Sequence, residues 1–318
     1  MAHHRFMSDG WASCPSSLLQ EAQKQDRKKL LVVNAGAALP LQSAYEAMQS
    51  GIASPLLVGD KETILAEAEK LGWQPADEDI IHASGEKEAA QRAAELVRED
   101  IASHHHLHQI GAILKGQLHT DVFMGALLDK SVGIRTGERL VHIFAIFPPD
   151  GSAPIMVSDA AVNVSPDHKT KAQSLLQMAK MGVALGMARP KIAVLSATET
   201  PISSMPASID AAEIAQWGQE HIEGADIEGP LSFDLALSAQ SVAIKGIEGA
   251  AVAGHADGLL VPDIVSGNIL YKALVYVGGG CAAGVVLGGS LPILLTSRAD
   301  PPQARLASIA LAAVMSAA

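Results

Sequence analysis

Short aliphatic runs alternate along the chain with longer segments in which apolar residues recur every three or four positions. Residues 28–36 and 54–60 are aliphatic runs of the kind that form buried parallel strands. Residues 41–50, 61–72 and 86–100 have the apolar spacing and the helix-forming residues of helices that cover a sheet. This alternation predicts an α/β protein with a mainly parallel sheet and helices on its faces.

The same alternation continues through the second half of the chain, with no internal repeat of fixed period. A chain of 318 residues is long for one compact unit, so two lobes are expected. Because no low-complexity linker separates the two lobes, the chain is expected to cross directly from one lobe to the other without a flexible tether. Further strands are predicted within residues 110–121, 139–148, 154–167, 191–200 and 256–274, and further helices over 168–188, 209–219 and from Gly267-Asn268 onward.

Polar residues follow several of these predicted strands. In parallel sheets, ligands gather at the carboxyl ends of the strands, so such turns are candidate edges of a binding site. The candidates for substrate binding at these turns are Lys115, His119 and Thr120, then Asp159 and Asn163, then Asp263.

Residues 292–302, PILLTSRADPP, place Ser297 and Arg298 between an aliphatic strand and the start of the terminal helix. Asp300 suits the N-cap of that helix and Pro301 its first position. Such a junction offers backbone N–H groups and the positive end of the helix dipole, and arginine adds a planar charged fork that matches phosphate. The stretch fits either a site for a phosphate-like anion or a simple helix cap beside an Arg–carboxylate pair.

Composition narrows the class of protein. The residues are 48% hydrophobic but only 3% aromatic, and 28 are glycine, which favours a layered α/β core of aliphatic side chains. A net charge of −11 without a basic block argues against a nucleic-acid partner. Two cysteines make no disulfide framework, which indicates a reducing, cytoplasmic setting. The start of the chain lacks the basic-then-apolar order of a signal peptide, and residues 1–27 are expected to be a flexible lead.

Three features invite other interpretations. Residues 273–296 carry no charge and are long enough to span a membrane, but their six glycines and one proline favour two buried strands joined by a Gly-rich turn. The histidine-rich residues 103–108 lack an acidic or cysteine partner at ligand spacing, so a solvated helix end or loop is expected and no metal is assigned. Cys281 has no nearby basic residue and is expected to be a buried hydrophobe.

Six segments together resemble the phosphate acetyl/butyryltransferase family, in the family's order and over most of the chain from about residue 30 to residue 316. The segment TSRAD, together with VGIRTGERLVH at 132–142, resembles the butyryl-type and short members of the family more than the long acetyl-type enzymes. The six segments are LKGQLHTD, SDAAVNVSPD, AVLSATETP, GPLSFDLALS, LLVPDIVSGNILYKAL and PILLTSRAD.

The resemblance implies the reversible reaction acyl-CoA + phosphate ⇌ acyl phosphate + CoA on a short acyl group, with acetyl as first choice and butyryl as second. It implies coenzyme A as a co-substrate, no metal or redox cofactor, and a homodimer; neither a nucleic-acid nor a membrane partner is expected. It also implies two three-layer α/β domains in a layout like that of isocitrate or isopropylmalate dehydrogenase. Residues 28–140 and 290–318 would form domain I, residues 141–289 an inserted domain II, and the active-site cleft would lie between them.

The resemblance also assigns roles to individual residues. Arg298 would neutralise the phosphoryl group, and Ser297 would hydrogen-bond the charge that develops on the acyl centre. Much of the rate would come from holding the thiol and the acyl group together in one ternary complex. Asn268 and Lys272, in the family's Gly-Asn-x-x-Tyr-Lys motif, would line the same cleft.

Two positions depart from the acetyl-type pattern. Those members carry an aspartate seven residues after the serine, where it can act as a base toward the CoA thiol, and Ala304 stands there in this chain. Asp300 is the nearest substitute. They also carry an arginine in the helix after the His-Thr turn, at the position of Met124. The residues that might compensate are Arg135, Arg139 and Lys115.

Two alternatives to an active acyltransferase are weighed. Ala304 and Met124 would suit a catalytically weak homologue that binds acyl-CoA as a sensor or partner. A metal- and NAD-dependent decarboxylating dehydrogenase would share the layout of the fold. However, the sequence shows no array of metal-binding aspartates, and VGGGCAAGVVLGG lacks the following helix and acidic residue of a dinucleotide-binding fingerprint.

Overall fold

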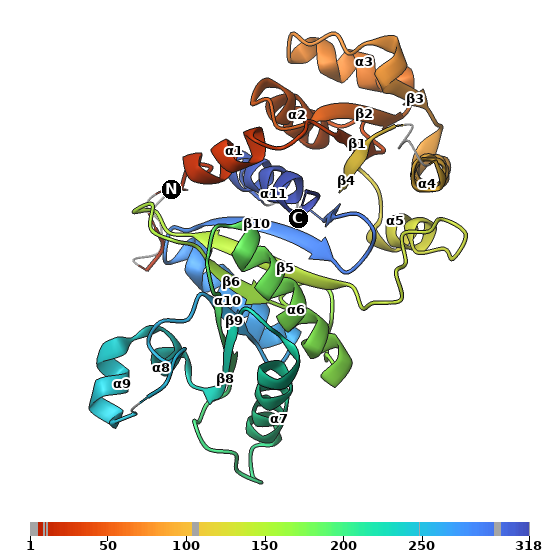
Figure 1. The fold of residues 1–318 in the computed structure, drawn as a ribbon. Coiled ribbons are helices and arrows are strands. Elements are labelled where there is room, and N and C mark those ends of the chain that lie inside the picture. Colours follow the sequence, from red (N-terminus) through yellow and green to blue (C-terminus); the bar gives the residue numbers. More distant parts are fainter. Residues whose placement is uncertain are drawn as a thin grey trace. The chain divides into compact units, whose positions relative to one another are not determined.

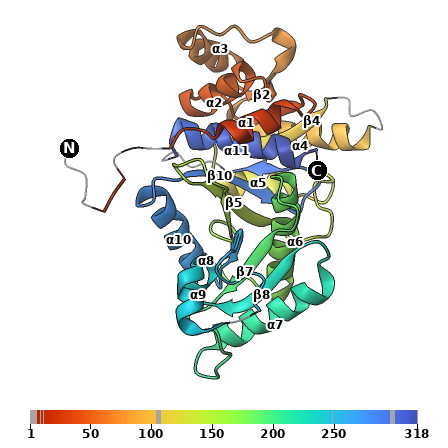
Figure 2. The same ribbon diagram turned by 60° about the vertical axis from the view of Figure 1, so that its left-hand side comes forward.

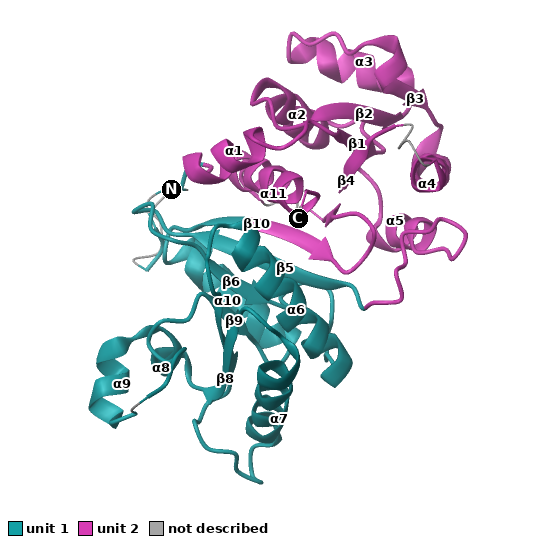
Figure 3. Ribbon diagram, viewed as in Figure 1, with its two compact units in different colours: residues 1–13, 139–282 teal, residues 14–138, 283–318 magenta. Residues whose placement is uncertain are grey.

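A computed structural model describes residues 6–8, 10, 12–103, 108–247, 249–295 and 300–317. The chain forms two compact units, residues 1–13 with 139–282 and residues 14–138 with 283–318 (Figure 3). Residues 139–282 form one uninterrupted stretch, so their unit is inserted into the other. Both units are α/β with mostly parallel strands, as the alternating pattern predicts.

The unit of residues 14–138 and 283–318 is built around β1, whose two neighbours, β2 and β4, both run parallel to it. β3 extends the sheet beyond β2 and β11 extends it beyond β4, again in parallel. β10, whose residues 283–287 belong to this unit, runs antiparallel to β11. The strands are β1 (Lys29–Val33), β2 (Ser54–Gly59), β3 (Ile80–His82), β4 (Ile110–Lys115), β10 (Cys281–Leu287) and β11 (Ile293–Leu294).

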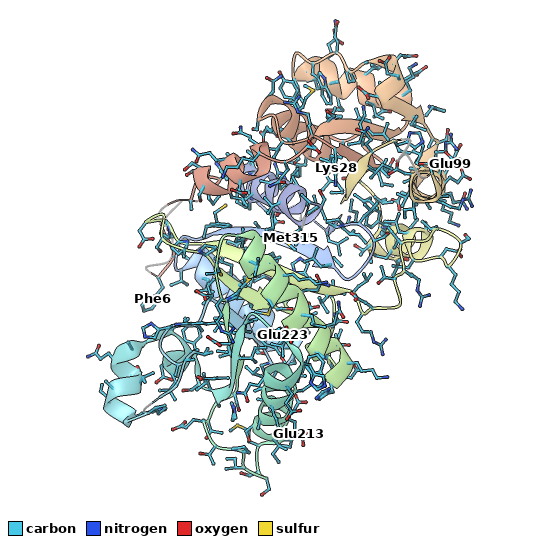
Figure 4. The ribbon with its side chains drawn as sticks, viewed as in Figure 1. Phe6, Lys28, Glu99, Glu213, Glu223 and Met315 are labelled. Atoms are coloured by element: carbon cyan, nitrogen blue, oxygen red, sulfur yellow. The ribbon has the colours of Figure 1, made fainter. Side chains whose placement is uncertain are left out.

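Helices cover both faces of this sheet. α11 packs against α1 and α2 on one side, and α4 and α5 pack together on the other (Figure 1). The Nζ of Lys28 donates to the carbonyl of Ser316 at 2.7 Å, just beyond Met315, which ties the end of α11 to the start of β1 (Figure 4). The helices are α1 (Ser16–Gln23), α2 (Ala38–Gln49), α3 (Lys61–Lys70), α4 (Gly85–Ala102), α5 (Thr120–Leu127) and α11 (Pro302–Met315).

The inserted unit has the strand order β5-β6-β9-β7-β8. β5 and β6 are antiparallel, and the other neighbours are parallel. The carboxyl ends of β6, β9, β7 and β8 therefore lie at one edge of the sheet. The strands are β5 (Val141–Phe147), β6 (Ile155–Ser158), β7 (Lys191–Leu195), β8 (Asp226–Leu231) and β9 (Gly258–Leu260).

The helices of the inserted unit also lie on both faces of its sheet. α6 and α7 lie side by side on one face, and α10 packs against β5 and β6 on the other (Figures 1 and 2). The helices are α6 (His168–Ala184), α7 (Pro206–His221), α8 (Phe233–Leu237), α9 (Ala239–Lys245) and α10 (Ile264–Tyr276).

Three local expectations are corrected. Within the supposed lead of residues 1–27, α1 is a helix with Leu18 and Ala22 buried against α11, because these two residues repeat at helical spacing. α10 begins at Ile264, three residues before Gly267, because the capping box at its start fixes the first turn. α11 begins at Pro302 with Pro301 at the N-cap, so the side chain of Asp300 is not its cap.

The uncharged stretch 273–296 begins as the end of α10 and continues as two buried strands. β10 and β11 are joined through Gly288 and Gly289, with Val286 opposite Ile293. Two buried strands with a Gly-rich connection were expected, and this part of the interpretation is confirmed. In the described part of the chain, none of the helices is both long enough and apolar enough to cross a membrane.

Candidate active site

The predicted site residues of the inserted unit gather around Asp159, which directly follows β6. Its side chain is 2% exposed. One carboxylate oxygen accepts the backbone N–H groups of Ala161 and Val162, each at 2.9 Å. The other accepts the backbone N–H of His142 at 3.0 Å and the side-chain amide of Asn163 at 2.6 Å. Asp159 therefore holds the loop after β6 against the start of β5.

Asn163 ties this loop to β5 a second time. Its amide nitrogen donates to the carbonyl of Leu140 at 2.9 Å as well as to Asp159. Two hydrogen bonds from one amide fix the orientation of the side chain. Asp159 and Asn163, predicted as substrate-binding residues, thus form one rigid loop at the carboxyl end of a strand.

The first turn of α10 lies directly on this loop. A β-carbon added to Gly267 would stand 2.5 Å from the carbonyl oxygen of Asp159 and 3.1 Å from the Cα of Ala160. The side-chain amide of Asn268 donates to the carbonyl of Ala160 at 3.2 Å. Lys272, one turn later and exposed, lies on the same face of α10 as Asn268. The predicted motif is therefore brought against the Asp159 loop.

Asp263 fixes where α10 begins. Its carboxylate accepts the backbone N–H of Ser266 at 2.9 Å, and the hydroxyl of Ser266 completes a capping box. The hydrogen bond from the Ser266 backbone lowers the pKa of the Asp263 carboxyl, against an opposing effect of burial. Asp263 thus positions the helix that carries Asn268 and Lys272.

His142 is a site neighbour that the sequence interpretation missed. It is 3% exposed, and its Nδ1 has no hydrogen-bond partner among the described residues. Its ring meets Phe144 edge-on at 4.3 Å between centroids, and Phe144 stacks on Tyr271 of α10 at 4.0 Å. Burial lowers the pKa of His142 to about 4, although Asp159 acts in the opposite direction. His142 is therefore neutral near pH 7 and packs as an aromatic residue.

A second group of predicted residues lies in the other unit, where β4 ends. The Nζ of Lys115 donates to the carbonyl of Leu118 at 2.9 Å. His119 precedes α5, and its backbone N–H and ring Nδ1 both contact the carboxylate of Glu86, at 3.0 and 2.8 Å. These bonds, led by the backbone one, lower the pKa of Glu86. Thr120, the first residue of α5, is exposed.

Glu86 was not predicted, although its place in the first turn of a helix was a usable signal. The end of β4 also approaches the end of β1 closely, since a β-carbon on Gly116 would stand 2.4 Å from the carbonyl oxygen of Val33. Only glycine fits that contact. Lys115, His119 and Thr120 therefore occupy one connected turn whose position is set by Glu86 and Gly116.

The predicted catalytic pair Ser297 and Arg298 lies outside the described residues. Asp300 follows that gap, and its carbonyl accepts a hydrogen bond from Nη1 of Arg305. Arg305 is 4% exposed and also donates from Nε to the hydroxyl of Ser43 in α2, at 3.0 Å. Arg305, which the sequence interpretation missed, thus holds the chain segment at Asp300 against the body of its unit.

The two positions that depart from the acetyl-type pattern both lie in helices of this unit. Ala304 is 8% exposed in the first turn of α11, and Met124 is half-buried in α5. Of the possible compensating residues, Arg139 pairs with Asp167 at 3.5 Å in the inserted unit. Asp167 also caps α6 through the backbone N–H of Thr170.

Cys281 and the histidine-rich tract are the other candidates for thiol or metal chemistry. Burial raises the pKa of the Cys281 thiol to about 12, so the thiol is protonated at neutral pH. Of the histidine-rich tract, residues 104–107 lie outside the described residues. Across the part of the chain that the structure describes, no three His, Cys, Asp or Glu side chains are grouped to hold a metal ion.

Comparison with known proteins defines the class of this fold and site. The family model described as "Phosphate acetyl/butaryl transferase" matches residues 106–313. The chain is 34% identical to a phosphate acetyltransferase of Rhizobium meliloti over 98% of this chain and 97% of that protein. It is 33% identical to a phosphate butyryltransferase of Clostridium acetobutylicum, over 94% of this chain and 97% of that protein.

A solved structure agrees with these matches. A branched-chain phosphotransacylase from Enterococcus faecalis V583 superposes with a TM-score of 0.75 at 28% identity, covering 90% of this chain and 99% of that one. The protein is thus of the acyltransferase class. It belongs to the phosphate acetyl/butyryltransferase family, as the six segments of its sequence indicate.

Proposed function

We propose that the protein catalyses acyl-CoA + phosphate ⇌ acyl phosphate + CoA. The observation that carries the proposal is similarity over nearly the whole chain to relatives named phosphate acetyltransferase and phosphate butyryltransferase. A phosphate oxygen attacks the thioester carbon, the C–S bond breaks, and the leaving thiolate takes up a proton. Coenzyme A is a co-substrate, and no resident cofactor is needed for this exchange.

The acyl group of the proposed substrate is short. Acetyl is the first choice from the resemblance of the sequence and butyryl the second, and relatives carry both names. The superposed structure is named for branched-chain acyl groups. The protein is further proposed to be a homodimer, from the resemblance of the sequence, and to be cytoplasmic, from its two cysteines without a disulfide framework.

In this proposal Arg298 neutralises the phosphoryl group and Ser297 donates to the oxygen that becomes negative in the transition state. Asp300 is the candidate base toward the thiol, and Arg305 is its positioning residue because it holds the Asp300 carbonyl. The candidates for substrate binding are Asn268 and Lys272 on α10, Asp159 and Asn163 in the loop after β6, Asp263 at the cap of α10, and Lys115, His119 and Thr120 at the end of β4.

Thiol release from acetyl-CoA and butyryl-CoA, with and without phosphate, tests the proposal. Release that depends on phosphate and falls at least a hundredfold in Arg298→Ala is expected, because one removed charge contact in the transition state has an effect of that order (~2.7–4 kcal/mol). Arg92→Ala removes an arginine from an exposed pair on α4 and should keep full activity.

A second candidate, a catalytically weak homologue that binds acyl-CoA, is favoured by Ala304 and Met124. Measurable binding of acyl-CoA without phosphate-dependent thiol release would select it over the enzyme.

A further inference from the structure

The inserted unit contains a hollow of about 380 Å³ where β7 and β9 end. We name it the β7–β9 hollow. Its walls come from the end of β7, the start of α7, the start of α8, the end of β9 and the first turns of α10. Its larger apolar lining residues are Leu195, Met205, Phe233, Val261, Pro262 and Leu270.

The topology of the sheet marks this place as a binding crevice. β7 is followed by α7, which packs on β7 and β8, whereas the neighbouring β9 is followed by α10, which packs on β5 and β6. The two connections therefore leave adjacent parallel strands in opposite directions. In open α/β sheets, ligands bind outside the carboxyl ends of the strands at such a switch point.

The lining of the hollow selects an apolar ligand. None of the described residues that line it is charged. The hydroxyls of Ser196 and Ser266 are engaged within the protein, with the sulfur of Met205 at 3.5 Å and with the backbone carbonyl of Asp263 at 2.9 Å. Phe233 is 44% exposed, so part of its apolar surface is open to a ligand in the hollow. A phosphate or another charged group would lose its hydration here without compensation.

The hollow and the loop after β6 share Gly267 as a neighbour. Val261 lines the hollow, and its Cγ2 would stand 2.9 Å from a β-carbon on Gly267. The same β-carbon would touch the carbonyl of Asp159 on the other side. An apolar group in the hollow is therefore close to the loop that carries Asp159 and Asn163.

We propose that the β7–β9 hollow receives the hydrocarbon chain of the acyl-CoA substrate, and that the protein prefers acyl groups of four or more carbons to acetyl. The inference rests on the proposed acyl-transfer function and reverses the order of the two acyl groups expected from the sequence. Acetyl has a single methyl group, so it would cover less of the apolar lining than a longer acyl chain. Each further buried methylene should raise affinity about fourfold, from ~0.8 kcal/mol per methylene.

Alanines that line the hollow provide the test. Ala197 is exposed at its rim and Ala207 is half-buried in the first turn of α7. Ala207→Leu and Ala197→Leu place a larger side chain in the space proposed for the acyl chain. Ala212→Leu makes the same change at a half-buried site elsewhere on α7 and is the matched control. Ala197→Leu lies outside regular structure, so it keeps the test valid if Ala207→Leu folds poorly.

Affinity for CoA, acetyl-CoA, butyryl-CoA and hexanoyl-CoA is measured by calorimetry, and kcat/KM with phosphate is measured for the three thioesters. The wild type should bind butyryl-CoA about fifteenfold more tightly than acetyl-CoA, since butyryl has two more methylenes. Each hollow variant should lower the butyryl-to-acetyl ratio about tenfold, while Ala212→Leu should not change it. A flat dependence on chain length, or equal weakening of CoA and butyryl-CoA in the hollow variants, would overturn the proposal.

The two proposals fail in different ways. If phosphate-dependent turnover is absent with every thioester, the proposed function fails, while the chain-length dependence of binding still decides the role of the hollow. If turnover is present but its chain-length dependence is the same in the wild type and in both hollow variants, only the hollow assignment fails.

Discussion

Gly267 of α10 lies so close to Asp159 that a β-carbon on it would stand 2.5 Å from the Asp159 carbonyl oxygen. This contact joins two segments that are more than a hundred residues apart in the sequence. It lets the first turn of α10 rest directly on the loop after β6, where Asn268 bonds the carbonyl of Ala160. The spacing between Asn268 and the Asp159 loop therefore depends on the absence of a side chain at position 267.

Gly267→Ala should separate α10 from this loop. Overpacking against backbone costs ~1–3 kcal/mol, which outweighs the gain of up to ~1 kcal/mol in helix propensity. We expect a lower urea midpoint and at least a tenfold loss of kcat/KM. Gly125→Ala in α5 is the control, because its β-carbon meets no atom within 4 Å. That variant should be as stable as the wild type or more so, and an active, stable Gly267→Ala protein would contradict the close contact.

A comparison of two aspartate caps separates the effect of Asp263 on substrate binding from its effect on helix stability. Asp60 caps α3 and Asp263 caps α10, each accepting a backbone N–H at 2.9 Å. Replacing either by alanine should lower the free energy of unfolding by ~1 kcal/mol. Only Asp263→Ala should also raise the KM for acyl-CoA, because α10 carries Asn268 and Lys272. Equal activity in the two variants would mean that Asp263 acts only as a helix cap.

The buried His142 should make stability depend on pH. Burial lowers its folded-state pKa to about 4 from an ordinary value of 6.5. The unfolded chain therefore takes up the proton first, so this contribution to stability is complete above pH 6.5 and is lost as the pH falls toward 4. Between pH 7 and pH 5 the wild type should lose ~2 kcal/mol through this group.

Urea unfolding of His142→Gln at the two pH values measures that loss, since glutamine does not titrate. The variant should lose ~2 kcal/mol less than the wild type on going from pH 7 to pH 5. His255→Gln, at an exposed histidine in a loop, should behave like the wild type. The same pH dependence in all three proteins would show that folding does not lower the pKa of His142.

Arg305 is expected to act on the site through Asp300. Arg305→Lys keeps the charge but loses the fork that reaches both Ser43 and Asp300, so stability should fall by ~2 kcal/mol. The KM for phosphate should rise, because Asp300 follows Arg298 by two residues. Ser43→Ala removes the partner of Nε and leaves the bond to Asp300 in place. A comparable rise in KM in Ser43→Ala would mean that Arg305 supports only the packing of α2 and α11.

The fold class was predictable because each element has a strong local signal. Aliphatic runs such as 29–33 and helical patterns such as 86–100 are complete within short windows, and both appear as expected in β1 and α4. The sequence pattern predicts the start of α10 at Gly267, three residues later than its observed start at Ile264. A glycine is required at position 267 because this residue contacts Asp159. The two residues are far apart in the sequence, so the local pattern around Gly267 does not reveal this contact.

Only those candidate site residues that follow a strand or belong to a sequence motif could be predicted. Asp159, Asn163 and Asn268 were singled out by their positions after strands or in a motif, and the structure brings them together. His142 and Arg305 were missed because their roles arise from burial and from partners far away in the sequence. The β7–β9 hollow could not be read from the sequence either, since its walls come from five separate segments.

The most direct test of the proposed function is to identify the product. Acetyl-CoA or butyryl-CoA is mixed with phosphate and the protein, and the reaction is followed by phosphorus NMR together with a thiol assay. An acyl phosphate resonance that grows in step with free CoA, and that is consumed when CoA is added in excess, is the predicted result. Thiol release without acyl phosphate, or no change in either signal despite bound acyl-CoA, would contradict acyl transfer to phosphate.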